Sequence, residues 1–162
     1  MKETSVVHST FTIERNYASP PARVFAAFAN QATKRRWFAE EKSSEVLEFM
    51  MEFRVGGREF TRFRFHRGPE GAPPKGTEIR NDTVYQDIVA DRRIVFAYTM
   101  TIGDRRISAS LATIELRPSA GGTDLIFTEQ AAFFEGGEGP QMREGGWRAL
   151  LSNLDNELRK SG

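Results

Sequence analysis

Two kinds of hydrophobic periodicity divide the chain, and its last stretch has the spacing of a helix. Between residues 140 and 160, apolar side chains recur at intervals of three and four, which places them on one face of an amphipathic helix. This apolar stripe consists of Trp147, Leu150, Leu151, Leu154 and Leu158. Gly145 and Gly146 stand immediately before the stripe, although a glycine inside a helix costs about 0.5–1 kcal/mol relative to alanine.

Most of the preceding chain alternates between apolar and polar positions, with the period of two that is typical of strands. A first strand is predicted over 11–17. Six more strands are predicted over 46–55, 58–67, 77–90, 93–102, 106–117 and 123–134. Turn residues such as Gly, Asp and Pro separate these six strands, and the short connections favour an antiparallel meander.

The segment between the first strand and the meander is helical in character. ASPPARVFAAFA predicts a short helix with prolines in its first turn, and a second short helix is predicted over 30–37. The element order therefore predicts the α+β class, with a curved antiparallel sheet of about six or seven strands packed on a long C-terminal helix. A gap between a curved sheet and a straight helix is a candidate ligand cavity. No repeat or linker interrupts the pattern, so residues 1–162 are expected to form one domain.

Composition narrows the class of partner. The 23 basic and 22 acidic residues leave a net charge of +1, which favours neither nucleic acid nor a membrane surface and fits a small neutral molecule better. No apolar run approaches the roughly 18 residues that a membrane-spanning helix needs, so no membrane insertion is expected. The amino terminus lacks the apolar core of a signal peptide, which predicts a cytoplasmic location.

The inventory of reactive side chains removes several enzyme classes. The chain has no cysteine, and His8 and His66 are its only histidines, so neither thiol chemistry nor a multi-histidine metal site is expected. The segment GAPPKGT lacks the Walker pattern because Lys75 precedes Gly76, and the glycine pairs carry no dinucleotide fingerprint. We therefore predict no metal and no cofactor.

Six segments in order resemble a known family. They are SPPARVFAAFAN, KRRWF, RVGGREF, YQDIVADRRIVFAYTM, SLATIELRPSAGGTDLIFTEQ and REGGWRALLSNLDNEL. Together they cover about residues 10–160 and resemble the START-like (SRPBCC) superfamily, within it most the activator of Hsp90 ATPase homologue-like family. The resemblance implies a helix-grip fold, in which a curved antiparallel sheet wraps the long C-terminal helix around an internal pocket. The superfamily includes lipid carriers, cyclases and chaperone activators, so this fold does not by itself assign a function.

The segment GGTDLIFTEQAAF holds the most suggestive polar residue. In a strand, Leu125, Phe127 and Glu129 share one face, so a face turned toward the helix would place the Glu129 carboxylate in a mostly apolar pocket. There Glu129 is a candidate to orient a ligand or to act as a general base. The alternative is that Glu129 is a structural carboxylate paired with an arginine. A bulge in the strand would turn the Glu129 side chain to the opposite face of the sheet.

The other predicted ligand-binding residues are mostly aromatic side chains of the strands and the start of the long helix. They are Phe63, Phe65, Tyr85, Phe96, Tyr98, Met100, Ser110, Phe127, Gly146, Trp147 and Leu150. The glycines before Trp147 either leave space for a ligand over the sheet, or mark a close approach to a strand or loop, or precede a helix that begins at Trp147.

Two basic segments are interpreted as solvated surfaces. In TRFRFHR, over 61–67, Phe63 and Phe65 face away from Arg62 and Arg64, so rings and cations do not share one nucleic-acid-binding surface. The KRR of 34–36 is interpreted as a solvated helix face, because acidic residues follow it.

Three functions remain open from the sequence. The first is binding of a hydrophobic or amphipathic small molecule between the sheet and the C-terminal helix. The second is an enzyme of the cyclase or hydrolase type with Glu129 as base and Tyr85 or Tyr98 as hydrogen-bond donor. The third, implied by the resemblance, is an interaction module that acts on a chaperone or another protein. An edge strand or the loop around Phe133 and Phe134 is a candidate homodimer interface.

Overall fold

The computed structural model describes residues 6–40, 44–68, 70, 72–135 and 139–160. The strands are β1 Val7–Tyr17, β2 Ser44–Met51, β3 Arg58–Phe65, β4 Glu78–Val89, β5 Arg93–Ile102, β6 Arg105–Ser119 and β7 Gly122–Phe133. The helices are α1 Pro21–Ala29, α2 Gln31–Lys34, the π-helical turn η1 Arg35–Ala39 and α3 Pro140–Lys160. The predicted α+β class, the seven strands and the helix-grip arrangement are confirmed.

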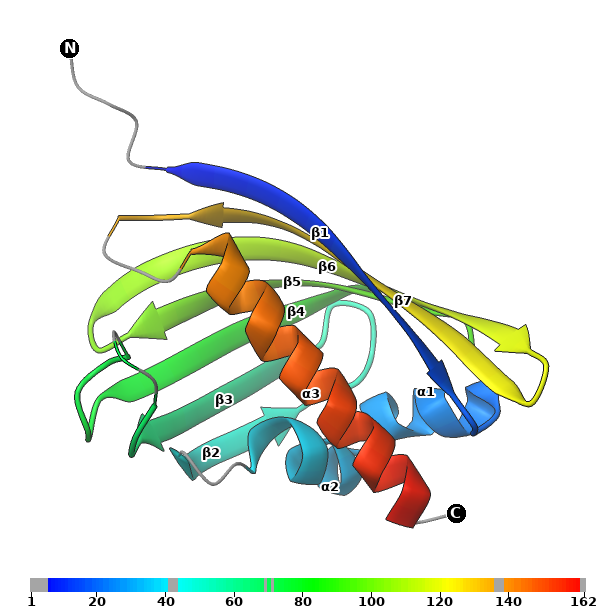
Figure 1. The fold of residues 1–162 in the computed structure, drawn as a ribbon. Coiled ribbons are helices and arrows are strands. Elements are labelled where there is room, and N and C mark those ends of the chain that lie inside the picture. Colours follow the sequence, from blue (N-terminus) through cyan, green and yellow to red (C-terminus); the bar gives the residue numbers. More distant parts are fainter. Residues whose placement is uncertain (1–5, 41–43, 69, 71, 136–138, 161–162) are drawn as a thin grey trace.

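The seven strands form one antiparallel sheet in the order β1-β7-β6-β5-β4-β3-β2. Strands β2 to β7 are a meander, and β1 closes the far edge by pairing with β7. Figure 1 shows the sheet curving around α3, which crosses its concave face diagonally, while α1 and α2 lie near the carboxyl end of α3. This is the two-layer packing that a sheet with one apolar face requires.

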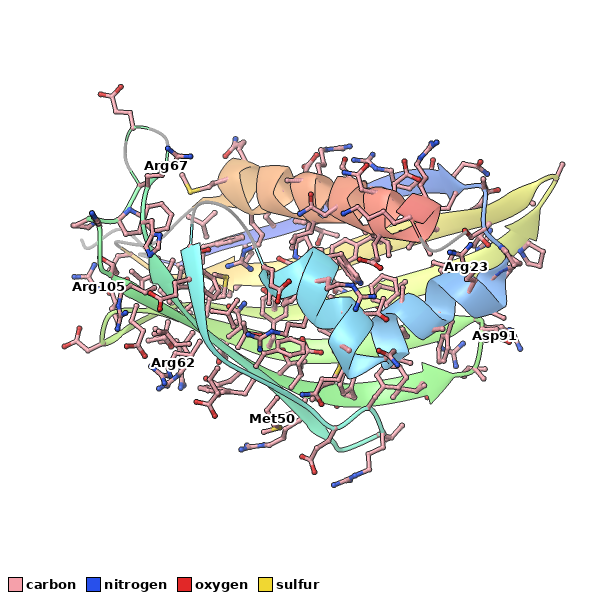
Figure 2. The ribbon with its side chains drawn as sticks, turned by 90° about the horizontal axis from the view of Figure 1, so that it is seen from below. Arg23, Met50, Arg62, Arg67, Asp91 and Arg105 are labelled. Carbon is pink, nitrogen blue, oxygen red and sulfur yellow. The ribbon has the colours of Figure 1, made fainter. Side chains whose placement is uncertain are left out.

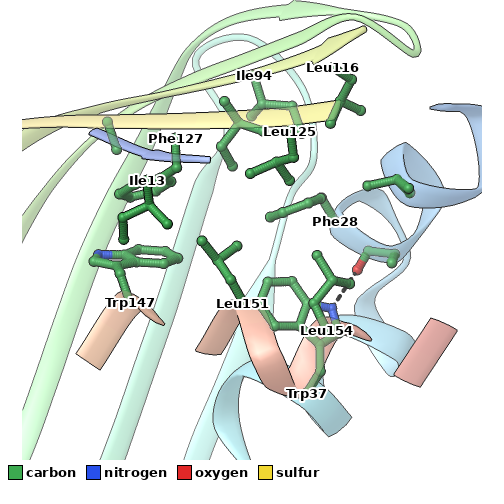
Figure 3. Close-up of a cluster of buried hydrophobic side chains, with 14 of the residues drawn as sticks. Ile13, Phe28, Trp37, Ile94, Leu116, Leu125, Phe127, Trp147, Leu151 and Leu154 are labelled. Atoms are coloured by element: carbon green, nitrogen blue, oxygen red, sulfur yellow. Dashed lines mark hydrogen bonds between the residues drawn. The ribbon is translucent and has the colours of Figure 1, made fainter. Parts of the chain in front are cut away.

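The main core lies between the concave face and the helices. Side chains from β1, β5, β6 and β7 meet Phe28 of α1, Trp37 of η1 and the apolar stripe of α3 (Figure 3). Trp37 is also tied down by its indole N–H, which donates to the carbonyl of Ala27 at 2.9 Å. The helices are therefore held over the concave face, and the cavity described below lies between that face, η1 and the first turns of α3.

The outer face of the sheet carries the charges that alternate with core residues. Arg62 bonds to Glu78 at 2.9 Å and lies within 3.6 Å of Glu48, while Arg64 bonds to Glu45 at 3.2 Å. Figure 2 shows Arg62 on the side of the sheet away from α3. The predicted alternation along 61–67 is therefore confirmed, because the cations lie outside.

The second short helix differs from its prediction. It begins as expected after Asn30, whose side chain caps it by accepting from the Thr33 amide at 2.9 Å. It then widens into η1, a single π-helical turn of the kind that often occurs at functional sites. Lys34, predicted on a solvated face, is buried with 4% of its surface exposed, so that interpretation was wrong for this residue. Lys34 is buried because it pairs with the carboxylate of Glu59 on β3, a partner that the sequence near Lys34 does not indicate.

The two glycines lie inside α3, which begins at Pro140. The alternative of a helix beginning at Trp147 is therefore wrong. A Cβ atom added at Gly145 or Gly146 would have no neighbouring atom within 4 Å, so a close approach to a strand is also excluded. What remains is open space beside Gly146.

Candidate functional site

A cavity of about 160 Å³ lies between β3, β4 and β5 on one side and η1 and the first turns of α3 on the other. Seven of the twelve predicted binding residues line it: Phe63, Phe96, Tyr98, Met100, Gly146, Trp147 and Leu150. Eight further lining residues were not predicted: Lys34, Phe38, Ala39, Ser44, Glu59, Asn81, Thr83 and Arg143. Gly146 is exposed as well as lining the cavity, so the side-chain-free turn of α3 lies at its mouth.

The cavity walls are largely aromatic. The Trp147 indole is central, with ring centroids of Phe38 at 6.0 Å, Phe96 at 6.3 Å and Phe127 at 4.3 Å. Phe96 continues toward Tyr98, with centroids 5.8 Å apart. Because these rings come from η1, β5, β7 and α3, the fold brings them together from segments that are distant in the sequence. Four of these rings line the cavity, those of Phe38, Phe96, Tyr98 and Trp147, and they offer stacking surfaces to a small ring.

The remaining five predicted residues lie elsewhere. Phe127 is fully buried behind Trp147, and Phe65 lies against the turn at Gly68. Tyr85 is buried and donates from its hydroxyl to Glu59. Ser110 and Glu129 belong to a polar cluster behind the cavity wall.

That cluster joins α3 to the sheet. Arg143 of α3 is 4% exposed, and its Nη1 lies 3.0 Å from the Tyr98 hydroxyl, 3.1 Å from Ser110 Oγ and 3.1 Å from Glu129 Oε2. Its Nη2 donates to Ser108 Oγ at 2.6 Å. The guanidinium therefore reaches β5, β6 and β7 together, and a buried arginine in this position clamps the first turns of α3 to the sheet.

Glu129 is completely buried and receives several of these bonds. The strand register of β7 is free of bulges against both neighbours, so Glu129 faces α3 together with Leu125 and Phe127, as the alternation predicts. Its donors are the Tyr98 hydroxyl, Ser110 Oγ at 3.4 Å and Arg143. The structure thus pairs Glu129 with an arginine. The groups turned to the cavity wall are Tyr98 and Arg143, with the carboxylate behind them.

The two tyrosines near the cavity are held neutral. Burial raises the pKa of Tyr98 far above its usual range, with the negative charge of Glu129 adding to the effect. Burial likewise raises the pKa of Tyr85, and the neighbouring Glu59 adds to it. Both phenols therefore remain hydrogen-bond donors at neutral pH. Tyr98 also accepts, from Arg143 and from the Trp147 indole N–H at 3.1 Å.

A second buried ion pair lies on the opposite wall. Lys34 Nζ is 2.7 Å from Glu59 Oε1, and the two side chains are 5% and 3% exposed. The ammonium also lies 4.7 Å from the Phe38 ring centroid and 5.8 Å from that of Phe96, and at such distances a cation is attracted to the face of an aromatic ring. Lys34 and Glu59 thus bring one charge of each sign to the cavity, so the pair is neutral as a whole.

Three of the lining residues that were not predicted are polar residues on apolar faces, a pattern that is visible in the sequence. Arg143 lies one turn before Trp147 on the apolar stripe of α3, where a charged side chain implies a buried partner. Glu59 shares the strand face of Phe63, and Asn81 shares that of Tyr85. Alternation identifies these faces, but the partner of each polar group comes from another element.

Among the described residues, no group of three or more His, Cys, Asp and Glu side chains is placed to hold a metal ion. In the same part of the chain, every helix is too short or too polar to cross a membrane.

Comparison with known proteins places this arrangement among its relatives. A family model described as "Activator of Hsp90 ATPase homolog 1-like protein" matches residues 18–159. A solved structure from Rhizobium loti is 50% identical, covers 95% of this chain and 99% of its own, and has a TM-score of 0.81. One from Rhizobium leguminosarum is 37% identical, covers 96% and 97%, and has a TM-score of 0.86.

More distant structures are similar to this chain in fold only. An AHSA1-like protein from Aeromonas hydrophila is 17% identical over 95% of this chain and 94% of its own, with a TM-score of 0.66. No protein with a curated description matches the chain.

Proposed function

The chain belongs to the family of Activator of Hsp90 ATPase homolog 1-like proteins, and from the cavity that its fold encloses we propose that it binds a small hydrophobic or amphipathic molecule between the sheet and α3. The observation that carries this proposal is the aromatic cavity itself, which has its mouth at Gly146. Its volume of about 160 Å³ is close to that of an engineered cavity of about 150 Å³ that binds benzene. The ligand is therefore of the size of one substituted ring.

Apolar burial alone limits the affinity. A ring that buries about 150 Å² of apolar surface gains roughly 4 kcal/mol at about 25 cal/mol per Å². The loss of translational and rotational freedom opposes this gain. A hydrocarbon is therefore expected to bind weakly, and a natural ligand needs polar contacts in addition.

The proposal is tested by closing the mouth. Gly146→Leu places a side chain over the cavity and is expected to abolish binding of toluene. Binding is measured by the chemical-shift change of the Trp147 indole N–H on addition of toluene. Gly145→Leu is the matched control, because its Cβ also has open space around it but the residue does not line the cavity. Unchanged toluene binding in Gly146→Leu, with a folded protein, would remove this entrance from the proposal.

Identification of a natural ligand requires protein from its own host. Native mass spectrometry of that protein, followed by denaturation, is expected to release a neutral ring-sized compound. Recovery of only large lipids would contradict the size inferred from the cavity.

The enzymatic alternative rests on Glu129 as a base. A general base must come within hydrogen-bond distance of its substrate. Here Glu129 is fully buried and already accepts bonds from Tyr98, Ser110 and Arg143, so no observation favours catalysis over binding. That alternative stays a prediction.

The chaperone-contact alternative also stays a prediction. The exposed large apolar side chains among the described residues are Val7, Met50, Val55, Leu111 and Met142. They belong to five different segments, which does not point to one apolar docking surface. At the predicted homodimer loop, Phe133 is buried under the Arg143 guanidinium, 5.1 Å from its ring centroid, so it is not an exposed contact.

A further inference from the structure

The cavity has two polar sides, and they differ in how completely their groups are hydrogen-bonded. On the side of β5 to β7, the Tyr98 hydroxyl accepts from Arg143 and Trp147 and donates to Glu129. Arg143 is bonded through both terminal nitrogens. The polar groups on this side are hydrogen-bonded within the protein, so they do not need a bond from a ligand.

The other side is built by β3 and β4. In their antiparallel register, Glu59 lies opposite Thr83 and Thr61 lies opposite Asn81. The four side chains therefore form two adjacent rows on the concave face, which we call the polar square. Glu59, Thr61 and Thr83 are 3%, 1% and 8% exposed. Glu59, Asn81 and Thr83 line the cavity directly.

The polar square lacks partners that a protein interior normally provides. Thr61 Oγ1 and Asn81 Oδ1 are both buried without a hydrogen bond. Glu59 Oε1 accepts from Lys34 and Tyr85, whereas no described residue donates to Glu59 Oε2. Lys34 gives only one of its three ammonium protons to a described residue. Since buried polar groups are nearly always bonded, several unmet groups at one place indicate an external partner.

The chemistry of the unmet groups defines that partner. Glu59 Oε2 and Asn81 Oδ1 accept protons, while Lys34 and the Asn81 amide donate them. A ligand group here must therefore both donate and accept. Because Lys34 and Glu59 neutralise each other, a charged ligand group would gain one contact and meet repulsion from the other member of the pair.

We propose that the polar square binds the neutral hydroxyl of a ring compound, so that the ligands of this cavity are phenol-like rather than hydrocarbons or carboxylates. The hydroxyl donates to Glu59 or Asn81 and accepts from Lys34 or Asn81. The ring then lies among Phe63, Phe96 and Trp147. This inference rests on the proposed binding function and adds the class of ligand and its orientation.

The test compares phenol with toluene, which has the same number of heavy atoms and no hydrogen-bonding group, and with benzoate. Dissociation constants are measured by titration calorimetry and by shifts of the Trp147 indole signal. The wild-type protein is expected to bind phenol about tenfold more tightly than toluene, the equivalent of one well-made hydrogen bond, and benzoate more weakly than phenol.

Variants assign the effect to the polar square. Asn81→Leu is expected to remove the preference for phenol, so that phenol and toluene bind with nearly equal dissociation constants. Thr83→Val, which preserves side-chain shape, is expected to reduce the preference in the same direction. Asn156→Leu, the same change at an exposed position of α3, is the control and keeps the wild-type ratio.

The outcomes separate the two proposals. If toluene binds as tightly as phenol, or if Asn81→Leu and Thr83→Val leave the ratio unchanged, the polar square is not the hydroxyl site although the cavity still binds rings. If benzoate binds most tightly, the inferred neutrality is wrong. If neither phenol nor toluene binds, the proposed cavity function fails and this inference fails with it.

Discussion

Thr61 and Thr123 show at the residue scale how two buried hydroxyls can affect stability in opposite ways. Both side chains are almost completely buried. Thr123 Oγ1 donates to the carbonyl of Ser19 at 2.7 Å, whereas Thr61 Oγ1 has no partner among the described residues. A bonded hydroxyl contributes to stability, and an unbonded one retains the cost of its removal from water.

Replacement of each threonine by valine tests this difference. Thr61→Val is expected to raise the free energy of unfolding by about 1 kcal/mol, because it removes an unmet hydroxyl at nearly constant shape. Thr123→Val is expected to lower it by about 1 kcal/mol, because the Ser19 carbonyl loses its donor. Urea denaturation of the ligand-free proteins measures both values. A loss of stability in both variants would show that Thr61 is bonded in solution, for example to water.

At the scale of elements, α3 is held by different means along its length. Its carboxyl half packs through Leu151, Leu154 and Leu158 into the core. Its first turns carry Gly145 and Gly146 and are held by Arg143, which bonds to three strands. The glycines weaken the helix where the cavity opens, and the buried guanidinium compensates by fixing that same end to the sheet.

Removal of the clamp is expected to be costly. Arg143→Met leaves the Glu129 carboxylate buried without its cation and should lower the free energy of unfolding by about 3–5 kcal/mol. Arg148→Met is the matched control on the same helix. Among the described residues, the Arg148 side chain pairs only with Glu144, on the surface, so its loss should change stability by less than about 0.5 kcal/mol. Chemical denaturation provides the comparison, and equal losses in the two variants would contradict the clamp.

At the scale of the whole molecule, all three tyrosines are buried and donate hydrogen bonds across elements. Tyr17 donates to the carbonyl of Leu151 at 2.9 Å, Tyr85 to Glu59 and Tyr98 to Glu129. Burial raises the pKa of each phenol above its ordinary value. One phenol thus bonds the sheet to α3, and the other two bond to the carboxylates of the buried ion pairs. Each phenol must stay protonated to donate its bond.

The raised pKa values predict alkaline unfolding. Below about pH 10, the ordinary tyrosine pKa, both folded and unfolded phenols are protonated and these groups add no pH dependence. Above it, unfolded tyrosines release protons that the folded protein retains, so the free energy of unfolding falls by about 1.4 kcal/mol per pH unit for each tyrosine. Phenolate absorbance should therefore rise only together with the loss of circular dichroism.

Tyr17→Phe isolates this contribution from other titrating groups. The variant should lose about one third of the tyrosine contribution to the alkaline slope, since two buried phenols remain. Phenolate absorbance that rises while the protein is still folded would show that the tyrosines are accessible, which is opposite to the structure.

Local patterns determined much of the architecture. The spacing of Trp147 to Leu158 predicts the buried face of α3, and alternation along β7 places Glu129 on the same face as Phe127. These features depend on helix and strand periods, which act between residues a few positions apart. Together with the resemblance of six ordered segments, these local patterns were sufficient to predict the helix-grip fold and seven of the residues that line the cavity.

Tertiary structure alone decided which charges are buried and which polar groups lack a partner. Lys34 has the sequence context of a surface cation, yet it is buried because Glu59 reaches it from a strand 25 positions away. Arg143 finds Tyr98 and Ser108 across still longer separations, and the polar square exists only in the register of β3 with β4. The free energy of a polar group depends on the atoms that surround it, and the periodicity of a sequence identifies a face without identifying its neighbours.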